Sequence, residues 1–192
     1  MSLKDKIKWD KKYQENPTLL QKREPSLFVK KYCNATKGRR VLDLAAGTGR
    51  NAIFLESRGF SVDAVDISKI ALDVLKSRSK DTINIIEEDL DNFTPTKDYD
   101  LIIKCNFLNR DLIEKTKKFL NRGGIYIVET YIEDKKNEKK EYNPDYLLKK
   151  DELLKIFKDG FEVLEYKTFW NESYELHKMR KAAIAVRKTV PS

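Results

Sequence analysis

The chain has 192 residues, of which 40% are hydrophobic and 36% charged, so we expect a globular protein and not a disordered or fibrous one. It contains only two cysteines, Cys33 and Cys105, and neither lies in a Cys/His cluster, which argues against a disulfide framework and a structural zinc site. The net charge of +8 comes mostly from lysines spread along the chain, a pattern typical of a solvated surface and not of a nucleic-acid interface.

Neither a membrane anchor nor a secretion signal is expected. No run of about 18 apolar residues occurs. The first residues, MSLKDKIKWDKKY, lack the apolar core of a signal peptide. We therefore predict a cytoplasmic protein that has no membrane partner and binds no metal.

Two helices are predicted at the beginning of the chain. A charged first helix places Trp9 and Tyr13 four positions apart, and therefore on one helix face. Pro17 ends this helix, and Pro25 begins a second one that runs to Cys33. We expect both helices to pack over one end of the segments that follow.

Strand-like and helix-like segments alternate from residue 41 onwards. Strands are expected at 41–44, 61–67, 83–87, 100–104 and 125–129, and helices at 51–58, 69–78 and 112–120, the last ended by Gly123 and Gly124. Alternation of this length predicts a parallel sheet with helices on both faces.

The end of the chain departs from this alternation. After an exposed, lysine-rich loop at 131–143 and a helix at 151–158, two strands are expected at 161–170 and 182–187. Their connection is too short for a helical crossover, so this pair should be antiparallel. The predicted fold class is α/β, a doubly wound seven-stranded Rossmann-like sheet, mostly parallel, with an antiparallel C-terminal strand pair.

The segment VLDLAAGTGR, residues 41–50, is the centre of the predicted site. At a junction of strand, glycine loop and helix, backbone N–H groups at the helix start face a bound ligand. Gly47 and Gly49 allow the backbone to approach that ligand closely. Asp43 near the strand end would repel a pyrophosphate, but it suits a ligand with ammonium or hydroxyl donors.

Two more acidic residues follow the next two strands. Asp66 ends the second strand and Asp89 follows the third, so both should share one crevice with Asp43 at the carboxyl edge of the sheet. Asp66 could accept two hydrogen bonds from a ribose diol, and Asp89 could accept one from the exocyclic amine of adenine.

These segments resemble, in order, the motifs of class I S-adenosylmethionine-dependent methyltransferases: VLDLAAGTGR, VDAVDIS, EEDL, DYDLIIKCNFL and FLNRGGIYIVET. Ala45 stands where the first glycine of the first motif usually is. A dinucleotide site is the alternative for this loop, because Gly47-x-Gly49-x-x-Ala52 satisfies its loose pattern. Asp43, Asp89, the double glycine before the fifth strand and the antiparallel C-terminal strand pair favour the methyltransferase.

The resemblance implies S-adenosylmethionine as the cofactor and S-adenosylhomocysteine as its product. The implied binding residues are Trp9, Tyr13, Asp43, Ala45, Gly47, Gly49, Asp66, Ile67, Asp89, Leu90 and Cys105. It also implies a single domain spanning 1–192, in which a helical lid, 1–37, closes over a Rossmann-like core, 38–192. Arg23 could hold the carboxylate of the cofactor, but an arginine on the surface is the favoured interpretation.

The only histidine, His177, lies in the segment ELHKMR before the last strand. This ending resembles that of the tellurite-resistance (TehB-like) methyltransferases, in which a histidine and arginines face the transferable methyl group. The resemblance implies catalytic roles for His177 and Arg180, while Lys178 replaces an arginine. Histidine is also the residue type best suited to accept a proton near neutral pH.

The predicted function is methyl transfer from S-adenosylmethionine to a small-molecule acceptor by in-line displacement. The basic pair Lys178 and Arg180 would suit an anionic acceptor. An RNA or protein methyltransferase and a non-catalytic S-adenosylmethionine-binding module remain alternatives. The lack of an Asn/Asp-Pro-Pro-Tyr motif after the fourth strand argues against methylation of a base amine.

Overall fold

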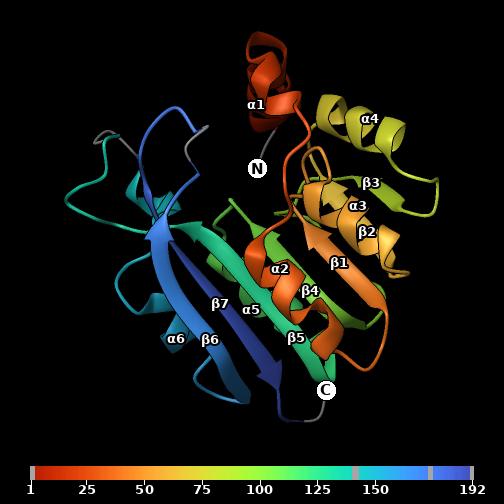
Figure 1. Cartoon of the computed structure of the whole chain (residues 1–192), viewed down its shortest axis with the longest axis vertical. Coiled ribbons are helices and arrows are strands. Elements are labelled where there is room, and N and C mark those ends of the chain that lie inside the picture. Colours follow the sequence, from red (N-terminus) through yellow and green to blue (C-terminus); the bar gives the residue numbers. More distant parts are fainter. Residues whose placement is uncertain (1–2, 140–142, 173–174, 191–192) are drawn as a thin grey trace.

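The computed structural model describes residues 3–139, 143–172 and 175–190. Its centre is a seven-stranded sheet of order β3-β2-β1-β4-β5-β7-β6 (Figure 1). The strands are β1 (Arg40–Leu44), β2 (Ser61–Asp66), β3 (Asn84–Glu87), β4 (Tyr99–Cys105), β5 (Leu120–Tyr131), β6 (Phe161–Trp170) and β7 (Arg180–Lys188). Strands β1 to β5 are parallel, and β7 is antiparallel to both β5 and β6, which confirms the predicted fold class.

Helices cover both faces of the sheet. They are α1 (Leu3–Glu15), α2 (Leu27–Tyr32), α3 (Arg50–Ser57), α4 (Lys69–Arg78), α5 (Arg110–Lys117) and α6 (Glu152–Ile156), with 3-10 turns η1 (Pro17–Leu20), η2 (Cys33–Ala35) and η3 (Pro144–Tyr146). Helices α2, α3 and α4 pack on one face and form one apolar core, and α5 and α6 form the second core on the other face (Figure 1). None of the described helices has the length and apolar character that a membrane crossing requires.

Local sequence signals account for the helix starts. The Ser68 hydroxyl accepts a hydrogen bond from the Ala71 N–H at 3.2 Å and caps α4, as its sequence predicts. The Ser26 hydroxyl caps α2 in the same way, through the N–H of Phe28 at 3.2 Å. Helix α1, which precedes the alternating part, packs against α4.

The predicted role of the double glycine is wrong. Helix α5 ends at Lys117, and β5 already begins at Leu120, so Gly123 and Gly124 lie inside the strand and cap no helix. They accompany a bulge, where the register of β4 against β5 shifts. A Cβ on Gly124 would lie 2.9 Å from the carbonyl oxygen of Asp100, so the neighbouring strand leaves room only for glycine.

The segment predicted as an exposed loop at 131–143 is partly buried where the structure describes it. Ile132 forms a parallel β-bridge with Leu148. Asn137 is buried, and its side chain donates to the Ile132 carbonyl at 2.9 Å and accepts from the Arg180 N–H at 2.7 Å. These contacts pack the segment against the beginning of β7. The remainder of this prediction, at 140–142, lies outside the described residues.

Candidate active site

A cavity of about 600 Å³ opens at the carboxyl edge of the sheet. It is lined by residues from α1 and η1, the loop after β1, the ends of β2, β4 and β5, and the connection between β6 and β7. The cavity therefore lies where parallel α/β sheets generally bind ligands, outside the carboxyl ends of the strands. Its volume is within the usual range for small-molecule sites, roughly 300–1,000 Å³.

The loop after β1 is built from residues with positive φ. The φ angles of Ala45, Gly47 and Gly49 are 59°, 55° and 82°. Gly49 is also the N-cap of α3, and a Cβ on it would lie 2.1 Å from Leu75 Cδ1 on α4. Glycine at this position therefore allows α3 and α4 to pack closely. Ala45 adopts the left-handed conformation in spite of its Cβ.

Asp43 lies beneath this loop, with 2% of its surface exposed. Its Oδ2 atom is buried and has no hydrogen-bond partner among the described residues. Burial is the main cause that raises the pKa of Asp43, to about 7; the positive charge of Arg50 opposes this rise, and the negative charge of Asp66 contributes to it. A buried carboxylate oxygen without a partner, in a residue that lines a cavity, fits a ligand that brings a cationic N–H donor. These residues therefore fit the ammonium group of a bound amino acid.

Asp66 connects the first two strand ends. Its Oδ2 accepts a hydrogen bond from the Gly47 N–H at 2.8 Å, and its Oδ1 accepts from the Ser68 N–H at 2.9 Å. Burial raises the pKa of this carboxyl group as well. A carboxylate has about four acceptor sites, so Asp66 can bind the two backbone groups and a ligand hydroxyl at once. The apolar side chains of Ile67 and Leu90 also line the cavity.

Helix α1 covers the cavity next to the glycine loop. The ring centroids of Trp9 and Tyr13 are 6.2 Å apart, which confirms that the two side chains share a face. The Tyr13 hydroxyl lies so close to the loop that a Cβ on Gly47 would be 3.1 Å from it. Asp10 fixes the helix to α4 by accepting a hydrogen bond from the Ser68 hydroxyl at 2.6 Å. The helix is thereby attached to the same turn that follows Asp66.

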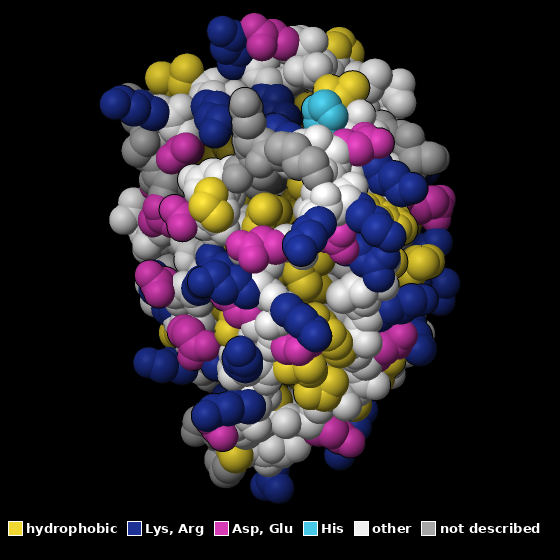
Figure 2. Space-filling view, turned by 90° about the vertical axis from the view of Figure 1, so that its left-hand side faces the viewer, with side chains coloured by type: hydrophobic (Ala, Val, Ile, Leu, Met, Phe, Trp, Pro, Cys, Tyr) yellow, Lys and Arg dark blue, Asp and Glu magenta, His cyan; other side chains and the backbone are white. Residues whose placement is uncertain are grey.

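The wall opposite the glycine loop comes from the C-terminal half of the chain. Tyr131, Glu175, His177 and Met179 line it, and the Tyr131 hydroxyl donates a hydrogen bond to Glu175. His177 is exposed and stands at the rim, and the face in Figure 2 shows the histidine side chain at the surface with acidic and basic side chains nearby. A proton acceptor at the rim, facing a cofactor-sized cavity, is an arrangement suited to group transfer.

The family model described as "Tellurite resistance protein TehB" matches residues 1–188. The chain belongs to the TehB family. This confirms the predicted class I S-adenosylmethionine-dependent methyltransferase family, and S-adenosylmethionine is the cofactor that this family implies.

Solved structures agree with the fold of this TehB-family chain. TehB from Haemophilus influenzae is 23% identical, with a TM-score of 0.76 over 86% of this chain and 63% of that chain. The glycopeptide N-methyltransferase MtfA, complexed with S-adenosyl-L-methionine, is 16% identical, with a TM-score of 0.62 over 87% of this chain and 88% of that chain. Among curated proteins, malonyl-[acyl-carrier protein] O-methyltransferase 2 of Ilyobacter polytropus is 26% identical over 142 residues, 65% of this chain. The TehB-family chain spans 55% of the length of that relative.

Most residues that the sequence predicts for the TehB-family site lie together. Those that line the cavity are Trp9, Tyr13, Asp43, Ala45, Gly47, Asp66, Ile67, Leu90, Cys105 and His177. Gly49 supports the loop as the N-cap of α3 and is not among the lining residues. Burial raises the pKa of Cys105, which favours the neutral thiol and not a nucleophilic thiolate.

Two predicted residues do not lie with the others at the cavity of this TehB-family chain. Asp89 is not among the lining residues, and its Oδ1 accepts a hydrogen bond from the Asp91 N–H at 3.0 Å within its own turn. Arg180 donates to the Thr168 hydroxyl at 2.9 Å, and its guanidinium lies 5.3 Å from the centre of the Trp170 ring. The Arg180 side chain therefore lies against β6.

Sequence reasoning missed several lining residues of this TehB-family chain. Lys12, Phe107, Tyr131, Lys139 and Glu175 come from five separate places in the chain. Phe107 and Glu175 lie within the motif segments DYDLIIKCNFL and ELHKMR, but no role was predicted for either residue. Lys12, Tyr131 and Lys139 lie in no motif, and only their convergence in the fold identifies them. For Lys12, the predicted helical lid at 1–37 is the signal that pointed to the site.

Proposed function

We propose that this chain binds S-adenosylmethionine in the cavity, transfers its methyl group to a small-molecule acceptor and releases S-adenosylhomocysteine. Family membership supports the cofactor. The observation that supports its placement is the Oδ2 atom of Asp43 beneath the glycine loop, which has no hydrogen-bond partner in the part of the chain that the structure describes. In this proposal Asp43 holds the methionine ammonium, Asp66 holds the ribose hydroxyls, and Ile67 and Leu90 contact the adenine.

The bound cofactor supplies a methyl group on a positively charged sulfur, which an acceptor attacks in line as the carbon–sulfur bond breaks and the sulfur keeps the electron pair. The chain then has to align the two partners and exclude water, and orientation of this kind is worth roughly 7–11 kcal/mol. Trp9 and Tyr13 of α1 cover the glycine-loop side, so we assign 1–37 as a lid over the core. His177 takes the proton of any acceptor that carries one.

The basic residues of the cavity support an anionic acceptor. Lys12, Arg23, Lys139 and His177 line the cavity, as does the acidic Glu175. The Lys12 ammonium lies 4.3 Å from the centroid of the Trp9 ring, and its desolvation, followed by the positive charge of Lys139, lowers the pKa of Lys12. An anion that binds beside Lys12 would favour its charged form and offset the repulsion from Lys139. The acceptor proposed here is therefore a small anion.

The test has two parts. Calorimetry with S-adenosylhomocysteine should show binding to the wild type and to His177→Ala, and at least tenfold weaker binding to Asp43→Ala. A turnover assay with radiolabelled S-adenosylmethionine and pairs of anionic and neutral acceptors of equal size should then favour the anions. The double variant Lys12→Ala/Lys139→Ala should reduce the preference for anionic acceptors.

Lys158→Ala is the matched control for the loss of a positive charge from the cavity. Lys158 is exposed, lies 3.6 Å from Asp159 and is not among the residues that line the cavity. It should leave the preference unchanged. Binding without turnover of any acceptor would favour a non-catalytic cofactor-binding module. A salt-sensitive RNA shift would favour an RNA methyltransferase.

A further inference from the structure

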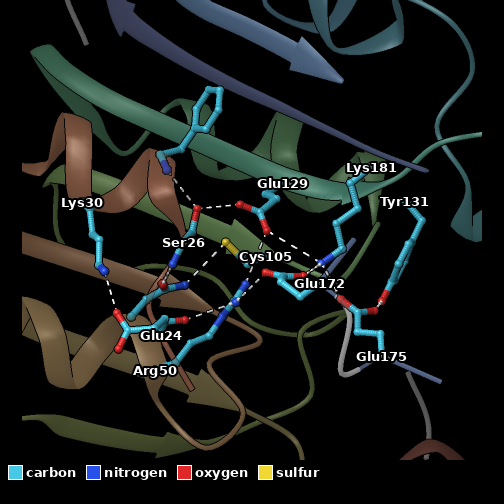
Figure 3. A network of polar contacts seen from close by, with 12 residues as sticks. Glu24, Ser26, Lys30, Arg50, Cys105, Glu129, Tyr131, Glu172, Glu175 and Lys181 are labelled. Atoms are coloured by element: carbon cyan, nitrogen blue, oxygen red, sulfur yellow. Dashed lines mark hydrogen bonds and ion pairs between the residues drawn. The ribbon is translucent and has the colours of Figure 1, made fainter. Parts of the chain in front are cut away.

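A network of charged side chains joins the sheet to the connection between β6 and β7 (Figure 3). Its centre is Lys181 near the start of β7, whose side chain is fully buried. The Lys181 ammonium lies 2.9 Å from Glu175 Oε1, 3.1 Å from Glu172 Oε2 and 3.9 Å from Glu129 Oε1. Arg50 at the start of α3 adds ion pairs of 3.4 Å to Glu129 and 3.5 Å to Glu172.

The partners of Lys181 come from two different parts of the fold. Glu129 belongs to β5, whereas Glu172 and Glu175 belong to the connection. Burial alone would lower the pKa of Lys181, but the carboxylates together raise it, so the ammonium remains charged. Removing one partner of an ion pair that is shielded from water is strongly destabilising, because the other charge is left without compensation. The connection is therefore held to the sheet by a strong, directional contact.

The same contact shapes the cavity. Glu175 uses its second oxygen to accept the hydrogen bond of Tyr131, and both residues line the cavity together with His177. Asn171 also orders the connection, by donating to the His177 carbonyl at 2.8 Å and accepting from the Met179 N–H at 2.9 Å. Those two bonds lie within the connection itself and do not attach it to β5.

We propose that Lys181 is a positioning residue for methyl transfer, which holds Glu172 and Glu175 so that His177 and Tyr131 form the acceptor-side wall of the cavity. Lys181 is not among the residues that line the cavity, so it acts through its carboxylate partners. The assignment of this wall to the acceptor rests on the proposed function; the attachment of His177 through Lys181 does not.

The single histidine of the chain allows a direct test without a known acceptor. The carbon-13-edited proton spectrum of the protein should contain one imidazole Cε1–H signal from His177, which should move when S-adenosylhomocysteine is added. In Lys181→Met this signal should shift, and its response to S-adenosylhomocysteine should weaken. Lys181→Arg should keep the wild-type position of the His177 signal and its response to S-adenosylhomocysteine, because arginine retains the positive charge.

Lys188→Met is the matched control. Lys188 is a buried lysine at the other end of β7, and its ammonium binds the carbonyl oxygens of Leu120 at 2.8 Å and Lys117 at 3.3 Å. Its replacement should lower the melting temperature but leave the His177 signal unchanged. With an acceptor in hand, Lys181→Met should lower kcat about tenfold or more, while the KM for S-adenosylmethionine changes much less.

A folded Lys181→Met protein that keeps the wild-type His177 signal and its response would overturn the proposal. If this variant does not fold, Glu175→Gln removes one of the three charge partners and should move the His177 signal in the same direction by a smaller amount. A His177 signal that does not move in Glu175→Gln would also overturn the proposal. Failure of the wild type to bind S-adenosylhomocysteine, in contrast, would reject the proposed function and leave the comparison of unliganded variants intact.

Discussion

Replacing Asp43 by asparagine tests the central feature of the site. Burial holds the pKa of Asp43 at about 7 in the fold, against an ordinary value of 3.8. Since one pH unit corresponds to about 1.4 kcal/mol, ionisation of this carboxyl costs the fold about 4 kcal/mol at pH 8, as an upper bound. The folded state binds the proton more tightly than the unfolded state, so this loss of stability develops as the pH rises from about 4 to about 7. Asparagine has nearly the same shape and carries no charge.

We therefore expect Asp43→Asn to unfold at higher denaturant concentration than the wild type at pH 8, and the difference to vanish near pH 4. The opposite is expected for ligand binding. S-adenosylhomocysteine brings an ammonium group that favours the ionised Asp43, so wild-type affinity should rise by up to about tenfold per pH unit below pH 7 and then level off. The asparagine variant should bind weakly at every pH.

Urea unfolding at pH 4, 6 and 8 and calorimetry over the same range measure both effects. Asp73→Asn is the control, because Asp73 is an exposed residue of α4 paired with Lys69, and it should change stability by less than about 0.5 kcal/mol. The burial argument would be refuted if Asp43→Asn were no more stable than the wild type at pH 8. It would also be refuted if the substitution changed the free energy of unfolding by the same amount at pH 4 and at pH 8.

Three further predictions concern stability. Ala45→Gly should stabilise the protein by roughly 0.5–1 kcal/mol, because alanine at a φ of 59° is strained, and a lower melting temperature would contradict this. Gly49→Ala should destabilise the protein by more than about 2 kcal/mol, because the added Cβ would clash with Leu75. A decrease of less than about 1 kcal/mol in the free energy of unfolding in urea would mean that α4 moves to accommodate the Cβ. Lys104 is fully buried, its amine binds the Phe107 carbonyl, and burial lowers its pKa well below 10.5. The unfolded state therefore binds more protons, so wild-type stability should rise with pH up to about 10, and Lys104→Met should abolish that rise in unfolding measured at pH 7 and 9.5.

The elements that the sequence predicts well are those with local causes. Helix α4 has the predicted bounds because Ser68 caps it and its apolar residues recur at helical spacing. Strand β6 also has its predicted bounds. The antiparallel C-terminal pair follows from the short connection alone, since a parallel pair needs a longer crossover.

The elements predicted wrongly depend on neighbours that are distant in sequence. Gly123 and Gly124 have the composition of a helix end, but the bulge against β4 and the carbonyl of Asp100 place them within β5. The loop after residue 131 is exposed at most of its described residues, as predicted, and departs from that prediction at Asn137, whose side chain accepts a hydrogen bond from the first residue of β7. Arg180 follows the family motif, and its guanidinium lies 5.3 Å from the centre of the Trp170 ring, a contact that the motif does not indicate.

The cofactor half of the candidate site was determined by the sequence itself. Asp43, the glycine loop and Asp66 each follow a strand, and parallel strands bring their carboxyl ends to one edge, so order along the chain suffices to place them together. The acceptor half was decided only by the tertiary structure. Tyr131, Glu175 and His177 meet because an antiparallel strand returns the chain to this edge and a buried ammonium collects carboxylates from separate segments. Such a meeting depends on three-dimensional packing and charge, and no local pattern of residues encodes it.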